Sequence, residues 1–263
     1  ETIAERTLLT RNNWVRGQAA NIAYNFTADA LANSITNVLD NSWLSVNGTL
    51  NANANSQFKF GASGRLNVYG SLNTSGTSGQ PVLFTNAAPG APRWTGITIA
   101  TLTRLNQLNY CTITNADKGI YASYSKLNLD HSSISNCRMG LDLYGMVSVK
   151  YYCNITNSII SNCDAGYPGL NIESSDKVTV TSSEFKLNGG WGARVYNYAN
   201  PRFYFNLFNS NFFGVTVENN SNPRFGDYVV GDVGGNTFQG NTSTAIIAIG
   251  ASPFLGLNTG GGV

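Results

Sequence analysis

Charged residues are scarce in this chain of 263 residues, because Asp, Glu, Lys and Arg make up 11% of it, against about 25% in an average globular domain. Asn, Ser, Thr and Gly take their place, a composition that is common outside the cell. The net charge of +2 gives no field that would attract nucleic acid, so we expect no nucleic-acid partner. We therefore expect an extracellular or cell-surface protein.

Residues that bind metals are also few, since the chain has four Cys, one His and two Met. Neither CxxC nor HxxxH spacing occurs, which argues against a zinc site, and we assign no catalytic residue, metal or cofactor. Every hydrophobic run is shorter than the ~18 residues that cross a bilayer. The chain starts at Glu1 instead of Met, and we expect that an upstream segment has been removed.

Residues 1–39 contain no proline and one glycine, and their apolar residues are mostly three, four or seven positions apart. This spacing is typical of an amphipathic helix, which over this length would measure about 55 Å. We therefore predict two parts, a long N-terminal α-helix over 1–39 and an all-β part over 40–263.

After residue 40 one phrase recurs, with the form Asn-x-x-x-Gly followed by alternating apolar residues, as in NADKGIYA and NCRMGLDL. Its copies begin at positions 115, 136, 162, 188, 210 and 241. A period near 22 residues with insertions is typical of a solenoid, and the period of two after the glycine indicates strands. We predict a parallel β-helix of about seven to nine coils, with equivalent residues ~4.8 Å apart.

Asparagine opens most copies of this phrase. Turn amides stacked in successive coils can hydrogen-bond along the solenoid, and Asn tolerates the left-handed backbone conformation of a tight turn. The expected Asn ladder consists of Asn115, Asn136, Asn162, Asn188 and Asn241.

Two neighbouring copies contain the same tetrapeptide, Ile-Ser-Asn-Cys, ending at Cys137 and Cys163. Consecutive coils would place these cysteines one above the other, about 5 Å apart between Cα atoms. We expect stacked, buried thiols. A disulfide is the alternative, because the separation allows a bond although parallel neighbours orient their Cβ atoms poorly for it.

The runs LNVYGSLNTSGTSGQPVLFTN, WTGITI and LNYCTITNADKGI, with the Asn phrases, resemble the right-handed parallel β-helix of the pectate-lyase-like superfamily, particularly its bacterial cell-surface members. The resemblance covers roughly residues 41–250. It implies the fold and leaves the activity open, because polysaccharide lyases, hydrolases, esterases, phage tailspikes and adhesins share that fold.

The segment GQAANIAYNFTADAL, within the expected helix, is similar to the N-terminal helix of type IV pilin-like subunits. This second resemblance implies self-assembly through residues 1–39. The alternative is a helix that caps the open end of the solenoid.

Outward residues that follow the glycine in successive coils would share one face of the solenoid. Glu173 and Glu218 would lie two coils apart, near 10 Å, which is too far for a retaining glycosidase pair and marginal for an inverting one. Tyrosines lie between such acids, and sugar rings stack on tyrosine; the alternative is that these rings only cover one another. The candidate carbohydrate-facing residues are Tyr121, Asp142, Tyr144, Glu173, Arg194, Tyr196 and Glu218.

Two further charged patterns are more easily explained by the repeat than by chemistry. Asp117, Arg138 and Asp164 occupy equivalent positions in three coils and predict a salt-bridged turn. Arg202 and Arg224 follow Asn-Pro in two coils and indicate repeated turns, with an anion site as the alternative.

Our leading functional hypothesis is a structural or adhesive cell-surface protein, of which a filament subunit is one form, because clustered acids are missing. The alternative is a carbohydrate-binding or polysaccharide-degrading β-helix protein, for which surface glycans would be the partners. The nine Asp and five Glu are fewer than an enzyme of this fold should show, which favours a protein that is not an enzyme over one that is.

Overall fold

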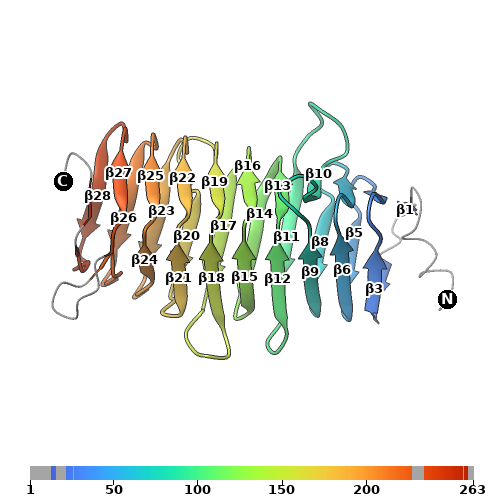
Figure 1. The fold of residues 1–263 in the computed structure, drawn as a ribbon, viewed down its shortest axis with the longest axis horizontal. Coiled ribbons are helices and arrows are strands. Elements are labelled where there is room, and N and C mark those ends of the chain that lie inside the picture. The colour runs from blue at the N-terminus through green and yellow to red at the C-terminus, as the bar shows by residue number, and fades with distance from the viewer. Residues whose placement is uncertain (1–12, 16–21, 26, 227–233, 257, 260–263) are drawn as a thin grey trace.

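The chain winds into a solenoid in which each full coil contributes three short strands, and successive coils stack along the long axis (Figure 1). The computed structural model describes residues 13–15, 22–25, 27–226, 234–256 and 258–259. Within these ranges the regular secondary structure is entirely β. Equivalent strands of neighbouring coils pair in parallel and form three long sheets.

Sheet A contains β1 (Asn13–Val15), β4 (Ile35–Val38), β7 (Gln57–Phe60), β10 (Val82–Asn86), β13 (Cys111–Thr114), β16 (Ser133–Ser135), β19 (Ile159–Ser161), β22 (Glu184–Lys186), β25 (Leu207–Asn209) and β27 (Thr237–Gln239). Sheet B contains β2 (Ile22–Tyr24), β5 (Trp43–Val46), β8 (Arg65–Val68), β11 (Trp94–Ile99), β14 (Ala116–Ser123), β17 (Met139–Tyr144), β20 (Leu170–Glu173), β23 (Trp191–Tyr196), β26 (Phe213–Glu218) and β28 (Thr244–Ile249). Sheet C contains β3 (Thr27–Ala30), β6 (Thr49–Asn53), β9 (Ser71–Ser75), β12 (Leu105–Asn109), β15 (Lys126–Asp130), β18 (Tyr152–Thr156), β21 (Val178–Thr181) and β24 (Arg202–Tyr204). Sheets A and B have ten strands each, so the solenoid is longer than the seven to nine coils predicted.

The core is built from columns of apolar side chains that point inward at every second position. Leu141 pairs with Leu170, which pairs with Ala193, and all three are fully buried. Aromatic rings stack in the same way, with centroids 4.9 Å apart for Phe58 and Phe84. This distance matches the strand spacing of ~4.8 Å, so each coil places its ring in contact with the ring of the next coil.

The corner between sheets A and B is a tight turn with one residue in the left-handed region. The φ angle is 59° at Asn115 and 55° at Asn136 and Asn162. In the later coils Leu187, Ser210 and Gly240 take this position, and the asparagine comes one residue later.

The expected Asn ladder therefore divides into two columns, Asn115, Asn136 and Asn162 at the turn and Asn188 and Asn241 inside it. In the inner column, the Nδ2 of Asn188 donates to the Oδ1 of Asn211 at 2.9 Å, and the Nδ2 of Asn211 donates to the Oδ1 of Asn241 at 3.2 Å. The one-residue shift could not be seen in the repeat phrase, because its copies begin with asparagine in both columns.

A second internal ladder lies at the corner between sheets C and A and was not foreseen. The Nδ2 of Asn206 donates to Asn236 at 2.9 Å, and the Nδ2 of Asn236 donates to Asn258 at 3.0 Å. These amides fill the turns of the last described coils.

The predicted N-terminal helix is wrong for the described residues of 1–39, which form β1 to β4. Hydrogen bonds join side chains 22 residues apart, from Asn51 to Asp29 and from Asn55 to Asn33, so the solenoid repeat already includes this segment. The helical spacing was a coincidence of period-two strands and short turns. The rest of the predicted helix, residues 1–12, 16–21 and 26, lies outside the described residues. The resemblance to pilin-like subunits loses its structural basis, and the described residues contain no helix long and apolar enough to cross a membrane.

All four cysteines are buried and unbonded. Cys137 and Cys163 follow β16 and β19, which pair directly, so they occupy equivalent positions in consecutive coils. Burial raises the pKa of the Cys137 and Cys111 thiols to about 11. The thiols are therefore protonated at neutral pH and shielded from reagents.

We expect fewer than about one thiol per chain to react with a thiol reagent in the native protein at mildly alkaline pH, because both burial and the raised pKa suppress thiolate. After denaturation without reductant, all four cysteines should react. If two thiols appeared only after reduction, a disulfide would be present and this account of the cysteines would be wrong.

Candidate functional site

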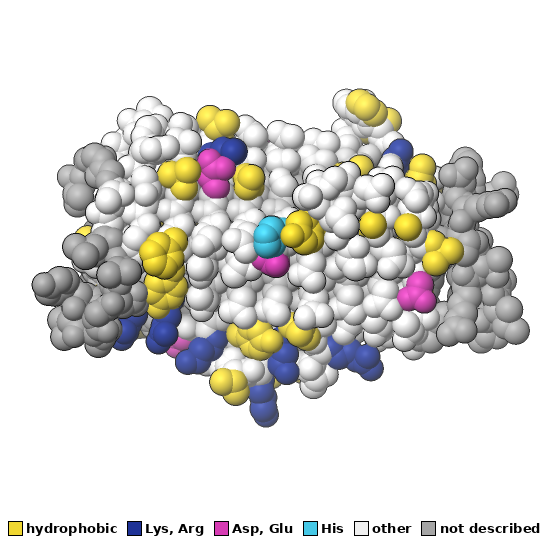
Figure 2. Space-filling model, viewed as in Figure 1, with side chains coloured by type: hydrophobic (Ala, Val, Ile, Leu, Met, Phe, Trp, Pro, Cys, Tyr) yellow, Lys and Arg dark blue, Asp and Glu magenta, His cyan; other side chains and the backbone are white. Residues whose placement is uncertain are grey.

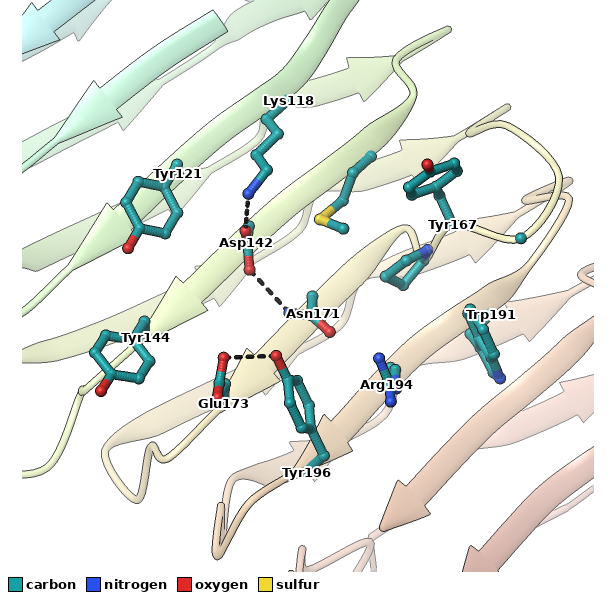
Figure 3. Close-up of a pocket in the computed structure, with 13 residues that line it drawn as sticks. Lys118, Tyr121, Asp142, Tyr144, Tyr167, Asn171, Glu173, Trp191, Arg194 and Tyr196 are labelled. Carbon is teal, nitrogen blue, oxygen red and sulfur yellow. Dashed lines mark hydrogen bonds and ion pairs between the residues drawn. The ribbon is translucent and has the colours of Figure 1, made fainter. Parts of the chain in front are cut away.

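A groove of about 540 Å³ lies on the outer face of sheet B, over β14, β17, β20 and β23 (Figure 3). This volume is within the range of pockets that hold small ligands. Five aromatic rings, two cations and two carboxylates are part of its lining. The lining residues are Lys118, Tyr121, Met139, Asp142, Tyr144, Gly166, Tyr167, Pro168, Asn171, Glu173, Trp191, Arg194 and Tyr196.

The parallel register brings these side chains together from four coils. One outward row runs from Tyr121 to its pairing partner Asp142 and on through Asn171 to Arg194. A second row, two positions further along each strand, contains Tyr144, Glu173 and Tyr196. Because side chains alternate between the two faces of a sheet, both rows face outward side by side.

Asp142 is held at the floor of the groove, where it is 8% exposed. Its Oδ2 lies 2.6 Å from the Nζ of Lys118, and its Oδ1 accepts a hydrogen bond of 2.8 Å from the Nδ2 of Asn171 (Figure 3). A buried carboxylate needs such partners. Its orientation is therefore fixed before any ligand binds.

Glu173 is fixed in a similar way by the next coil. The phenol of Tyr196 donates to its Oε2 at 2.5 Å, and the Nδ2 of Asn197 donates to its Oε1 at 2.9 Å. Burial and, secondly, the hydrogen bond to Glu173 raise the pKa of Tyr196 to about 12. The phenol is therefore neutral and serves as a donor at physiological pH.

We expect the substitution Glu173→Gln to lower the pKa of Tyr196, because it removes a negative acceptor that favours the protonated phenol. In the wild type the folded-state pKa is above the unfolded value of about 10, so Tyr196 contributes stability that is lost as pH rises from about 10 towards 12. The pKa is measured from the near-ultraviolet absorbance of tyrosinate, taken as the difference between each protein and its Tyr196→Phe partner. An unchanged midpoint in Glu173→Gln would contradict the assignment.

Arg194 lies between aromatic side chains at the other end of the groove. Its guanidinium carbon is 4.5 Å from the ring centroid of Tyr196 and 5.6 Å from that of Trp191. Its Nη2 lies 2.7 Å from the Oε2 of Glu218 on β26. Cation–π contacts and the ion pair together hold Arg194 and its neighbouring rings in place.

The end of the groove next to sheet A is braced by ion pairs between turns. Arg138 binds both oxygens of Asp117 at 2.5 and 2.7 Å and donates to the phenol oxygen of Tyr167 at 3.0 Å. Asp164 pairs instead with Arg93, whose hydrogen bond holds the pKa of this carboxyl below its usual range. The predicted salt-bridged turn therefore contains two separate pairs.

Of the seven predicted carbohydrate-facing residues, six are part of the groove lining, namely Tyr121, Asp142, Tyr144, Glu173, Arg194 and Tyr196. Glu218 lies on the neighbouring strand and acts as the ion-pair partner of Arg194. Whether any of them contacts a sugar stays a prediction.

Sequence reasoning missed Lys118, Met139 and Trp191, although a signal was present. Each directly precedes a strand glycine, and Lys118 pairs with Met139 in adjacent strands. That shared position is the signal, whereas strict alternation would have placed these residues inward. Two consecutive buried residues, such as Gly119 and Ile120, shift the alternation by one at the glycine and make this a third outward row. Tyr167 gave no such signal, because it lies in a loop before β20.

The chemistry of the groove is that of oriented hydrogen-bonding groups next to aromatic faces. The described residues contain no group of three or more His, Cys, Asp or Glu that could hold a metal ion. Both carboxylates are engaged by neighbouring donors, and the rings of Tyr144 and Trp191 lie on opposite sides of them (Figure 3). The site can bind a ligand that has both apolar faces and hydroxyl groups.

Comparison with known proteins finds a family match and distant structural similarities. Residues 144–252 match the family described as "Right handed beta helix region", and no curated protein sequence matches the chain. The periplasmic alginate epimerase AlgG is 10% identical with a TM-score of 0.48, over 88% of this chain and 75% of that one. The A-module of mannuronan C-5 epimerase AlgE4 from Azotobacter vinelandii is 12% identical with a TM-score of 0.40, over 91% of this chain and 86% of that one. The three parallel sheets and the match of residues 144–252 show that this chain is a right-handed parallel β-helix, as its resemblance to pectate-lyase-like proteins implied.

Proposed function

We propose that the groove on sheet B binds a carbohydrate chain and that the protein works outside the cytoplasm as a glycan-binding β-helix. The observation that carries this proposal is the combination of five aromatic rings with two pre-oriented carboxylates in one groove. Sugar rings have apolar C–H faces that pack on aromatic rings and hydroxyls that donate to carboxylates.

The length of the groove favours a polymer over a single sugar. It crosses β14, β17, β20 and β23, which at ~4.8 Å per strand amounts to about 14 Å along the solenoid. Tyr121 and Trp191 come from the first and last of these strands. A chain of several sugar units would contact both.

The hydrogen bonds and the ion pair of the two carboxylates favour ligand binding over catalysis as the main role of the groove. Asp142 is paired with Lys118, and Glu173 accepts hydrogen bonds from two side chains. Such acids orient hydroxyl groups well, because their own positions are fixed. Chemistry on the bound glycan would be a further property, and the assay below also measures it.

Surface display agrees with this role, because a rigid solenoid with a glycan-binding face suits adhesion. The low content of charged residues, 11%, supports a site outside the cytoplasm. We do not extend the proposal to a filament subunit, because residues 27–38 belong to the solenoid and not to an assembly helix.

The proposal is tested with an array of neutral and acidic glycans, followed by calorimetric titration of every glycan that binds. We expect binding to a defined set of oligosaccharides and stronger binding as their length increases up to the span of the groove. Each bound glycan is then incubated with the protein and assayed for new reducing ends, unsaturated products and altered stereochemistry. If the protein bound none of the glycans on the array, the proposal would be wrong.

A further inference from the structure

In each of six successive coils a cation lies in the connection that leaves sheet B or at the first residue of the sheet C strand that follows it. We call this corner of the solenoid the basic edge. Its cations are Arg104, Lys126, Lys150, Lys177, Arg202 and Arg224. Figure 2 shows the Lys and Arg side chains gathered along the lower edge of the molecule.

The first five of these positive charges have no ion-pair partner among the described residues. Among the described residues of these connections the one acid is Asp176, which accepts a hydrogen bond from Asn200 at 2.8 Å. Six of the 16 Lys and Arg residues of the chain therefore line one corner of the solenoid.

Apolar side chains are exposed in the same connections. Val149 is 83% exposed and Leu102 is 61% exposed, and both lie in loops that project from the body, between β17 and β18 and between β11 and β12 (Figure 1). Tyr198, in the connection between β23 and β24, is 68% exposed. Lys150 directly follows Val149, so exposed apolar side chains and cations lie next to each other on the basic edge.

We infer that the basic edge docks on a membrane surface that contains anionic lipids. Cations near such a surface are attracted to its negative headgroups, while apolar side chains at loop tips enter the boundary between headgroups and acyl chains. Six coils at ~4.8 Å per step give a contact line of about 24 Å. Electrostatic attraction and insertion of apolar side chains both strengthen such binding, so the two together bind the membrane more tightly than either alone.

Two observations favour a membrane over a soluble acidic polymer as the partner. Leu102 and Val149 are aliphatic and would add little to a contact with a sugar or phosphate chain. Their loops project further than the strands (Figure 1), so they would reach a flat surface first. The groove lies on sheet B, outside this corner, and would stay accessible in the docked protein.

The test is co-sedimentation of the full chain with vesicles of phosphatidylcholine, with and without phosphatidylglycerol. We expect binding to the anionic vesicles only, weakened by added salt. The double substitution Lys150→Gln/Lys177→Gln should reduce the partition coefficient by about 30-fold. The matched control Lys59→Gln/Arg65→Gln removes two charges from sheets A and B and should leave binding unchanged.

A third variant, Leu102→Ser/Val149→Ser, separates the insertion of apolar side chains into the membrane from the electrostatic attraction to its lipids. It keeps every charge and should lose about tenfold or more in binding to anionic vesicles. Equal effects of the two charge variants, or equal binding to both kinds of vesicle, would overturn the inference. So would binding to a soluble polyanion without binding to vesicles. Thermal unfolding midpoints of all variants verify that they are folded.

Discussion

Replacing Asn211 with alanine is expected to lower the free energy of unfolding by about 4 kcal/mol, because several buried polar groups lose their partners at once. The Oδ1 of Asn211 accepts from the backbone N–H and the Nδ2 of Asn188, at 3.1 and 2.9 Å. Its Nδ2 donates to the carbonyl of Phe185 at 2.9 Å and to the Oδ1 of Asn241 at 3.2 Å. Asn211 is fully buried, so water cannot replace these hydrogen bonds.

Urea denaturation followed by circular dichroism measures this loss. The matched control is Asn162→Gly, at the turn column, where the residue is exposed and has a φ of 55°. Glycine adopts this conformation without strain, so the control should change the stability by less than about 1 kcal/mol. If the two substitutions had equal effects, the division of the asparagines into an inner ladder and a turn column would have no energetic meaning.

Replacing Trp191 with alanine is expected to weaken binding of the best array glycan by about 30-fold, equivalent to about 2 kcal/mol. Trp191 is the largest aromatic side chain in the groove lining, and Arg194 holds its position from the same strand. Its removal takes away one stacking face and loosens the support of Arg194. Calorimetric titration with the array glycan gives the change in Kd.

Trp43 provides a matched control on the same sheet. It is the first residue of β5, as Trp191 is of β23, and the guanidinium of Arg65 lies 4.8 Å from its ring centroid. The two strands are far apart in sheet B, with five strands between them. Trp43→Ala should leave glycan binding unchanged, and equal weakening by both substitutions would show that the groove is not the binding site.

The fold could be predicted from the sequence because the repeat and its period of two are visible without any long-range information. The N-terminal segment shows the limit of that reasoning. Its apolar spacing fitted a helix, yet Asp29 and Asn51, and Asn33 and Asn55, are 22 residues apart, which is the solenoid period. The repeat outweighs the helical pattern because each strand gains a hydrogen-bonding partner in the next coil.

The candidate site could be predicted only where it follows the period of the strands. Tyr144, Glu173 and Tyr196 share a register, so counting from the glycine brought them together. The pair of Arg93 and Asp164 joins residues 71 positions apart through irregular turns, and no periodicity encodes it. Tyr167 is placed by its hydrogen bond from Arg138, which depends on the same irregular turns.

A crystal structure of the protein with its best array oligosaccharide tests the central claim most directly. We expect sugar rings packed against Trp191 and Tyr144, with hydroxyl groups within hydrogen-bonding distance of Asp142 or Glu173. An oligosaccharide bound at another face, with the groove on sheet B empty, would contradict the proposed function.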